Sequence, residues 1–575
     1  MTRGPRPTPV AELTRHFFRE LFYLRFLTDA GADSVRRTII AIIAGLFSLT
    51  IFFPQLIVAR YVALSGRPTP EPYRIALLGG QLFTICLSMF ISGLLAALVC
   101  QSVFPDETDY RILRTLPLTR RVIFGAKGLA LLAFSSIFIA AAVVVFGIGF
   151  AVASGGRWAE HSLLIGVCAH ATTIGVASAC AVAAVLSIHG SIVLASPRSW
   201  SKSASVASQS AMIGVLILSL PLIVRTAGDA QFIQSRTWLL YLAPPAWFLG
   251  LEQMLQGSHD PYFARLAVCA GLGCVGSMVA IGSCYLVLYR RFEQVASRSF
   301  SAPLHRSGKR RRAETSRRDG RRHPVEAAVT AFTLTTLRRS GLHQIVFTSI
   351  VACGVALTVN RLLGAPSLSW IETSQLPSAG MIAVVAAPLV LMFFSVIGLR
   401  QTLMVPLELR ANWVFRLALD DGLRRHQMDA VERALIGFCL APSLALTLPL
   451  QLIALGPVRS IVEFQLNACA GLLLVEIVTR KWRRIPFTCT YIPARRPLVH
   501  TVLLAFTAYT LFVSVGSGLI IASLRNRSIW LILTGTLLAV IVALRRHRLA
   551  ECERAGVEFE DSLPDDVQLM PLSPT

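Results

Sequence analysis

"LLIGVCAHATTIGVASACAVAAVLSIHGSIVLA", Leu163–Ala195, contains no Asp, Glu, Lys or Arg. A helix that crosses a bilayer needs about 20 consecutive, mostly apolar residues. This stretch is longer than that, and its only ionisable side chains are two cysteines and two histidines. It therefore predicts a membrane-spanning helix.

Eleven further apolar runs of similar character occur along the chain, so the sequence predicts an all-α polytopic membrane protein with about 12 spans. In the first half they are Thr38–Ala59, Ile75–Cys100, Val122–Val152, Ala204–Val224 and Phe263–Leu288. In the second half they are Ile345–Leu363, Met381–Leu399, Ala434–Leu455, Ile461–Val478, Val499–Ala522 and Ile529–Leu544.

The composition agrees with a bilayer environment. Of the 575 residues, 54% are hydrophobic and 15% charged, whereas a soluble protein has about 25% charged residues. The net charge of +24 is explained by the basic residues that membrane proteins collect on the cytoplasmic side, so nucleic acid is not expected as a partner. The 12 cysteines lack CxxC or Cys/His spacing and predict neither a metal site nor a disulfide framework. The N-terminus has no cleavable signal pattern.

The distribution of basic residues predicts the topology. With the N-terminus inside, most Lys and Arg fall in cytoplasmic segments, so both termini are expected in the cytoplasm. We expect an N-terminal segment with an interfacial amphipathic helix at 1–37, six-span halves at 38–291 and 326–546, a basic linker at 292–325, and a tail at 547–575. The linker contains "RSGKRRRAETSRRDGRRH", Arg306–His323, which has no apolar periodicity and is typical of a disordered segment near anionic headgroups.

The two halves begin alike, which predicts an internal duplication. In "AELTRHFFRELFYLRFL", Leu13, Phe17, Leu21 and Leu24 form one helical stripe, as in a helix lying on a membrane surface. After Pro324, "VEAAVTAFTLTTLRR" repeats this pattern more weakly. Two spans then follow in each half, and after them comes a charged segment that opens on proline.

These charged segments, "PDETDYRILRTLP" from Pro105 and "PLELRANWVFRLALDD" from Pro406, are expected to dock into a partner. Apolar residues ringed by charges fit a groove, and Trp and Arg often dominate interface energies. The alternative is that both segments pack against lipid or neighbouring loops. The docking residues predicted are Asp106, Asp109, Arg111, Leu113, Leu116 and Pro117 in the first segment and Glu408, Arg410, Trp413, Phe415 and Arg416 in the second.

The first segment resembles the stretch after the second span in six-span permeases of ATP-binding-cassette (ABC) exporters, the type 2 ABC permease superfamily. The positions matched are Asp109, Leu113, Leu116, Pro117 and Lys127. In that family the segment is the coupling helix, which docks into a cleft of a separate ATPase subunit. The resemblance implies a permease driven by two ATPase copies. ATP and Mg²⁺ would be held by that partner, because this chain has no GxxxxGK[ST] loop.

Two other stretches carry the resemblance. "YLAPPAWFLGLEQMLQG", Tyr241–Gly257, is similar to a segment of bacterial permeases at the place of the family's outer re-entrant helices, which implies an outer gate. The other interpretation is an aromatic anchor at headgroup level. The residues concerned are Pro244, Pro245, Trp247 and Phe248. "PLELRANWVFRL" resembles large bacterial permeases in which two six-span halves are fused. The second half departs from the family, since its coupling segment lacks the Leu-Pro ending and only Ser523–Ser528 stands where re-entrant helices belong.

Few ionisable residues lie within the spans, which counts against a proton- or sodium-driven carrier. Glu463 and Glu476 lie near opposite ends of one span, where we expect them to reach an interface, and His170 and His189 are the better candidates for burial. "LLGGQ", Leu77–Gln81, lies inside a span, and its glycines predict close helix packing.

The expected function is thus the permease subunit of an ABC exporter in the bacterial cytoplasmic membrane. No cofactor is expected in this chain, and the absence of GxSxG and HExxH motifs predicts that it is not an enzyme. The alternatives are a secondary carrier of the major-facilitator type and a non-transporting scaffold or membrane-embedded enzyme. Lipids, peptides and amphiphilic drugs are all admissible substrates.

Overall fold

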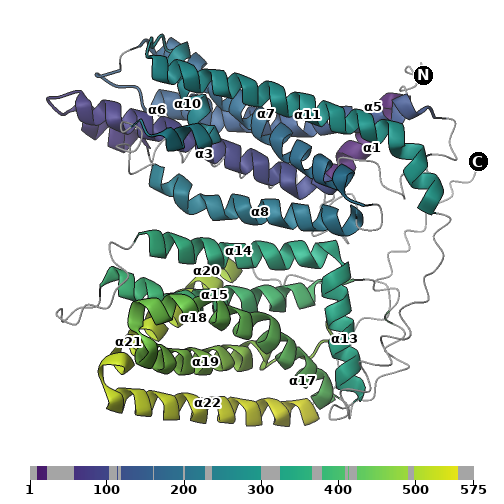
Figure 1. Cartoon of the computed structure of the whole chain (residues 1–575), viewed down its shortest axis with the longest axis vertical. Coiled ribbons are helices and arrows are strands. Elements are labelled where there is room, and N and C mark those ends of the chain that lie inside the picture. The colour runs from purple at the N-terminus through teal and green to yellow at the C-terminus, as the bar shows by residue number, and fades with distance from the viewer. Residues whose placement is uncertain are drawn as a thin grey trace, which may run out of the picture. The chain divides into compact units, whose positions relative to one another are not determined.

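The computed structural model (Figure 1) consists of helices in two compact units, Met1–His305 and Arg306–Thr575, here called unit 1 and unit 2. Of the residues that it describes, 89% are helical and none lies in a strand. The boundary between the units falls inside the predicted linker 292–325, although the last helix of unit 1 continues to Ser299. The described residues are 9–22, 57–102, 113, 118–159, 161–197, 201–226, 236–299, 324–364, 378–407, 412, 424–489 and 498–554.

Eleven helices within the described residues are long and apolar enough to cross a membrane. They coincide with eleven of the twelve predicted spans, which confirms an all-α, multi-pass membrane protein. The remaining prediction, Thr38–Ala59, lies outside the described residues except for 57–59, which are helical together with residues 60–65. The basic run Arg306–His323 also lies outside them.

In unit 1 the apolar runs form a bundle around helices α3 and α7, which pack along each other. Leu82 and Ile85 of α3 contact Ile174 of α7 in a core from which water is excluded. The elements are α1 (Pro9–Phe22), α3 (Glu71–Val99), η1 (Cys100–Ser102), α5 (Arg120–Ala142), η2 (Val143–Ile148), α6 (Gly149–Ala153), α7 (Leu163–Ala195), α8 (Ser201–Thr226), η3 (Trp238–Leu242), α10 (Pro244–Leu255) and α11 (Pro261–Ser299).

The N-terminal amphipathic helix is α1, and its apolar stripe packs against α5. Phe17 and Leu21 are buried there, and Leu13 packs against the same cluster, whereas Leu24 lies outside the described residues. Lys127 of α5 places its ammonium group 4.9 Å from the centre of the Phe17 ring, a cation–π contact that adds to the apolar packing.

In unit 2 the central helix is α15, which is buried on nearly all sides. Its apolar character all round is typical of a helix enclosed by others. The elements are α13 (Pro324–Arg339), α14 (Gly341–Leu363), α15 (Ala379–Met404), α17 (Arg424–Leu435), η6 (Ile436–Leu440), α18 (Ala441–Leu455), α19 (Pro457–Thr479), α20 (Leu498–Thr510), η7 (Leu511–Val515), α21 (Gly516–Arg525) and α22 (Arg527–Arg554).

Each unit repeats the same set of helix neighbours, as the predicted duplication requires. The first described helix of each unit packs on the start of the third span, and the second span packs on the fourth and fifth. The matching pairs are α1·α5 with α13·α17, α3·α7 with α15·α19, α3·α8 with α15·α21, and α7·α11 with α19·α22. Matching neighbours of this kind are what two units with the same helix order would have.

Helix α10 is the main difference between the units. In unit 1 it lies between the last two spans, whereas in unit 2 the span that ends at Arg525 is followed by one that begins at Arg527. Any function that depends on α10 therefore belongs to unit 1.

Candidate functional site

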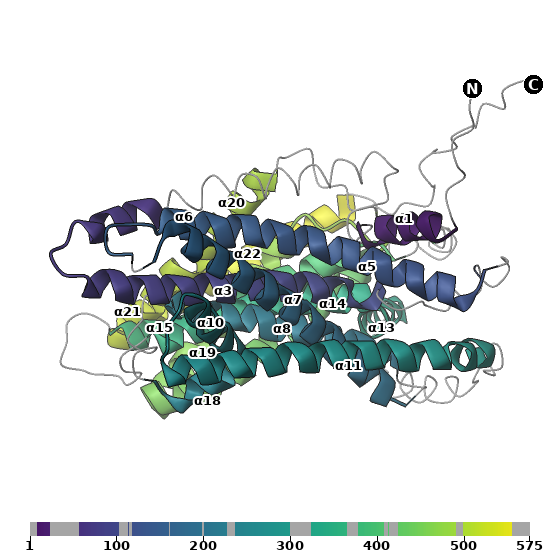
Figure 2. The same cartoon turned by 90° about the horizontal axis from the view of Figure 1, so that it is seen from above.

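Helix α10 begins at the Pro-Pro pair quoted above. Pro244 and Pro245 occupy its first turn, where the missing N–H groups cost nothing and the fixed φ angle favours a helical start. The indole N–H of Trp247 donates to the Tyr241 carbonyl oxygen at 2.8 Å and so ties α10 to the turn before it. Figures 1 and 2 show α10 and α1 at opposite ends of unit 1.

The burial of the α10 side chains agrees only in part with an aromatic anchor at headgroup level. Trp247 is half-buried, but Phe248 is fully buried and packs in the core shared with α3 and α7. An aromatic belt at headgroup level requires exposed rings, so Phe248 does not fit that interpretation. The short helix is instead packed onto α3, α7 and α11 at the end of the bundle.

A network of hydrogen bonds joins α10 to α3 and α7. The carboxylate oxygen Oε1 of Glu252 lies 2.9 Å from Nδ1 of His170, and His170 Nε2 lies 3.1 Å from the Thr84 hydroxyl oxygen. Gln256 donates to the same carboxylate oxygen at 3.2 Å, and Gln253 donates to Gln81 at 3.0 Å. We call these six residues the α10 cluster: Gln81, Thr84, His170, Glu252, Gln253 and Gln256.

The centre of the α10 cluster is buried, whereas Gln253 and Gln256 at its edge are half-buried. Glu252 and Thr84 have 0% exposed surface and His170 has 1%. The Phe150 ring covers the imidazole, with 5.0 Å between ring centres. Ionisable groups in such surroundings are costly unless paired, which is why buried membrane residues of this kind are treated as functional candidates.

The sequence singled out His170 but not its partner. Glu252 stands in an apolar stretch, "WFLGLEQML", where a carboxylate is unexpected in a helix with a buried face. This carboxylate in an otherwise apolar stretch was the sequence feature that could have identified the partner of His170. The other histidine, His189, has Nδ1 at 2.9 Å from the Ser208 hydroxyl of α8, as expected of a histidine that serves helix packing.

Close approach of α10 to α11 depends on Gly250. A methyl group there would lie 2.5 Å from Leu266 Cβ and 2.7 Å from the Phe263 carbonyl oxygen. We therefore expect Gly250→Ala to displace α10 and destabilise unit 1 by about 1–3 kcal/mol, measured as a lower apparent melting temperature in detergent. Gly276→Ala on α11 is the control, since a methyl group there meets nothing within 4 Å. Equal melting temperatures for the two variants would contradict this packing.

Unit 2 contains a smaller polar cluster at the corresponding depth of its fourth span. Glu463 accepts from Gln451 at 3.0 Å and from Asn467 at 3.3 Å, and all three side chains are fully buried. Glu463 stands six residues into α19, as His170 stands seven residues into α7. Both positions are about 10 Å along the helix from its first residue.

The second buried cluster of unit 2 lies at its α13 end and is centred on Arg548 of α22. The guanidinium lies 2.6 Å from Glu432 of α17 and 3.2 Å from Glu476 of α19, and it donates to Thr479 at 3.0 Å. Arg433 of α17 pairs with Glu326 of α13. The expectation that Glu463 and Glu476 reach an interface is wrong, because they are 0% and 3% exposed and are held by polar partners inside the unit.

Comparison of the chain with models of protein families, with curated proteins and with solved structures finds no match. Its function is therefore inferred from the sequence and from the geometry within each unit.

Among the predicted docking residues, the structure describes only Leu113. Its side chain is 8% exposed and packs with Phe17 and Leu21 of α1 and Ile123 of α5. It thus attaches the first charged segment to its own unit rather than standing free for a partner. The following predicted residues lie outside the described ones: Asp106, Asp109, Arg111, Leu116, Pro117, Glu408, Arg410, Trp413, Phe415 and Arg416.

The second charged segment is also attached to its own unit. Asn412, 3% exposed, donates from its side-chain amide to the Thr488 carbonyl oxygen at 2.6 Å. At the start of the segment, the Leu407 amide donates to the Phe487 carbonyl oxygen at 3.0 Å. The buried Phe487 ring packs edge-on against His343 of α14. Each charged segment therefore has at least one residue that packs on, or is hydrogen-bonded to, the unit to which it belongs.

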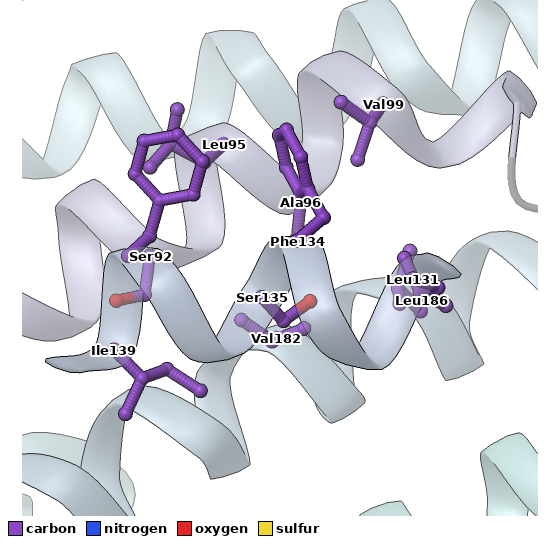
Figure 3. A pocket seen from close by; sticks show the side chains of 11 residues that line it. Ser92, Leu95, Ala96, Val99, Leu131, Phe134, Ser135, Ile139, Val182 and Leu186 are labelled. Atoms are coloured by element: carbon purple, nitrogen blue, oxygen red, sulfur yellow. The ribbon is translucent and has the colours of Figure 1, made fainter. Parts of the chain in front are cut away.

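The bundle of unit 1 has a small hollow between α3, α5 and α7, lined by Ser92 and Ser135 and by apolar side chains (Figure 3). Its free volume of about 10 Å³ is room for roughly one water molecule, so it is too small for a transported substrate. Within the described residues no group of three or more His, Cys, Asp or Glu side chains is placed to hold a metal ion.

Proposed function

We propose that this chain is the transmembrane permease subunit of an ABC exporter in the bacterial cytoplasmic membrane. A separate ATPase, present in two copies, would dock on the two charged segments and bind ATP and Mg²⁺. The basic connecting segments support a cytoplasmic location for the α1 and α13 ends of the units. The α10 end would then face outward.

One observation carries the proposal: each charged segment leads directly into a third span whose start is packed against an amphipathic helix. The first segment ends at Pro117, three residues before α5 begins at Arg120, and α5 packs on α1. The second ends at Asp421, three residues before α17 begins at Arg424, and α17 packs on α13. A pull on either segment would therefore move a span and a surface helix together, which is what coupling to an external motor requires.

The test is purification of the tagged full-length chain from its native membranes, followed by identification of bound proteins. We expect a nucleotide-binding subunit with a GxxxxGK[ST] loop, and ATP-dependent transport when both proteins are reconstituted in vesicles. Transport by this chain alone, following a proton gradient and unaffected by ATP, would overturn the proposal.

The buried pair His170–Glu252 favours a second candidate, a proton-driven secondary carrier, because such carriers use intramembrane carboxylate and histidine groups. The same vesicle experiment separates the two. A carrier loses transport when the proton gradient is collapsed with ATP present, whereas an ATP-driven permease does not.

A further inference from the structure

We propose that Gln451, Glu463 and Asn467 of unit 2, here called the Glu463 cluster, bind one alkali cation such as Na⁺. This inference does not depend on the proposed function or on the energy source for transport. It is carried by three observations: buried oxygen atoms that have no partner, a carboxyl group that has no cationic partner, and hydroxyl groups on the same helix faces.

Each side chain of the Glu463 cluster has an oxygen atom without a hydrogen-bond partner. The amide nitrogens of Gln451 and Asn467 both donate to Oε1 of Glu463, at 3.0 Å and 3.3 Å. The oxygen atoms that remain are Gln451 Oε1, Glu463 Oε2 and Asn467 Oδ1, which are buried and have no donor among the described residues. Buried polar atoms of native proteins nearly always have a partner. Three such oxygens on three contacting side chains therefore point to an electropositive ligand.

The charge of the cluster indicates the valence of this ligand. All three residues are 0% exposed, and within the part of the chain that the structure describes, Glu463 forms no ion pair with Lys, Arg or His. Glu252 of unit 1, in contrast, is paired with His170. A buried carboxylate without a counter-charge is strongly unfavourable. A monovalent cation would balance the one negative charge, whereas a divalent cation would leave a buried positive charge.

Two hydroxyl oxygens lie on the same helix faces as the cluster. Ser460 precedes Glu463 by three residues on α19, and Thr447 precedes Gln451 by four on α18, so each shares a face with a member of the cluster. Both are buried, and each hydroxyl donates to the carbonyl oxygen four residues earlier, at 2.7 Å for Ser460 and 3.0 Å for Thr447. Because their protons are directed to the backbone, both oxygens keep lone pairs for a cation.

One proton or one water molecule would satisfy the cluster less completely. A proton on Glu463 would remove the charge and supply one donor, which leaves at least one of the two amide oxygens without a partner. A water molecule donates two hydrogen bonds and leaves the carboxylate charge in place. A cation contacts several oxygen atoms at once and balances the charge. Because the donors are oxygen atoms only, the site favours a hard cation over a transition metal.

The bound cation would join two helices. Gln451 belongs to α18, whereas Glu463 and Asn467 belong to α19. A ligand that binds only the folded arrangement stabilises it further as the ligand concentration rises above the dissociation constant. Na⁺ should therefore increase the stability of unit 2, and this effect should require the Glu463 carboxylate.

The first experiment measures equilibrium binding of radioactive sodium to the purified full-length chain in a neutral detergent at about pH 8, since metal ligands must be deprotonated. N-methyl-D-glucamine chloride replaces NaCl to keep the ionic strength constant. We expect saturable binding of about one Na⁺ per chain, because the cluster offers one carboxylate. Competition by KCl and CaCl₂ tests the class of ion. Stronger competition by Ca²⁺ than by Na⁺ itself would overturn the assignment of a monovalent cation.

Glu463→Gln, which keeps the shape but removes the charge, should weaken Na⁺ binding by at least about tenfold. Gln451→Met removes one oxygen with little change in volume and should weaken binding without abolishing it. Glu71→Gln, the same change at an exposed glutamate at the start of α3, should leave binding unchanged. The absence of saturable binding in the unsubstituted chain would overturn the proposal, and so would an unchanged affinity in Glu463→Gln.

The apparent melting temperature gives a second measurement that needs no substitution. In the unsubstituted chain it should rise with the concentration of NaCl at constant ionic strength and should not rise with N-methyl-D-glucamine chloride. In Glu463→Gln it should be the same in both salts. Equal melting temperatures in the two salts for the unsubstituted chain would refute the proposal even if the variants failed to fold.

Discussion

Replacing Arg548 with methionine is expected to destabilise unit 2 by about 3–5 kcal/mol. The arginine is 2% exposed and its guanidinium contacts Glu432 and Glu476, which come from two different helices. Methionine fills much of the same volume but leaves two buried carboxylates close together, with only the exposed Arg545, 3.7 Å from Glu432, as a nearby cation. The loss should appear as a large drop in the apparent melting temperature of the full-length chain in detergent.

Arg546, two residues before Arg548 on α22, supplies the control. Arg546 is exposed on the same helix, so Arg546→Met removes an equal charge without uncovering a buried carboxylate and should change stability by less than about 0.5 kcal/mol. Adding Glu432→Gln and Glu476→Gln to Arg548→Met should restore much of the lost stability, since no buried charge then remains. If the two arginine variants melted alike, Arg548 would not be the centre of this cluster.

The spans were predictable because the cost of taking polar groups into lipid depends on local composition. The stretch Leu163–Ala195 coincides with α7 at both ends. Prediction was less exact at the end of α22, since the predicted span Ile529–Leu544 covers only the first part of this helix, which continues to Arg554. Charged residues end an apolar run without ending a helix, because Arg and Glu are good helix formers.

The local irregularities of the spans left no mark in the sequence pattern. The third span of each unit contains a π-helical turn, η2 in unit 1 and η6 in unit 2, and α20 and α21 are joined by a third, η7. Such a turn inserts one residue into the helix and rotates everything beyond it. An all-apolar segment has no contrast between faces, so a rotation of this size cannot be detected from hydropathy.

The polar clusters depended on contacts between distant residues. His170 and Glu252 are 82 positions apart, and Glu432 and Arg548 are 116 apart. The sequence placed Glu476 at the correct depth, but depth does not tell whether a side chain faces water, lipid or another helix. Only the rotation of α19, set by its packing against α15 and α22, turns that carboxylate toward Arg548.

Leu113→Asp is expected to reduce ATP-driven transport by about tenfold or more, because an uncompensated buried carboxylate costs several kcal/mol. Under the proposed function, Leu113 is the point at which motion of the first charged segment enters α1 and α5. The carboxylate would separate the segment from both helices. Transport is measured in vesicles that contain the ATPase, with limited proteolysis to detect release of the segment. Leu113→Met should preserve transport, since it nearly conserves volume.

Attachment and docking then predict opposite outcomes for binding. If Leu113 attaches the segment to its own unit, Leu113→Asp should still co-purify with the ATPase, which would be held by the second segment and by the other residues of the first. Trp413→Asp combined with Phe415→Asp should instead weaken co-purification, because these residues are proposed as contacts with the ATPase itself. Leu113→Asp could instead lose co-purification while α1 stays protected from protease. That result would mean that Leu113 leaves its contacts with α1 and α5 to bind the ATPase. The burial of Leu113 against α1 and α5 would then describe only the state without the ATPase.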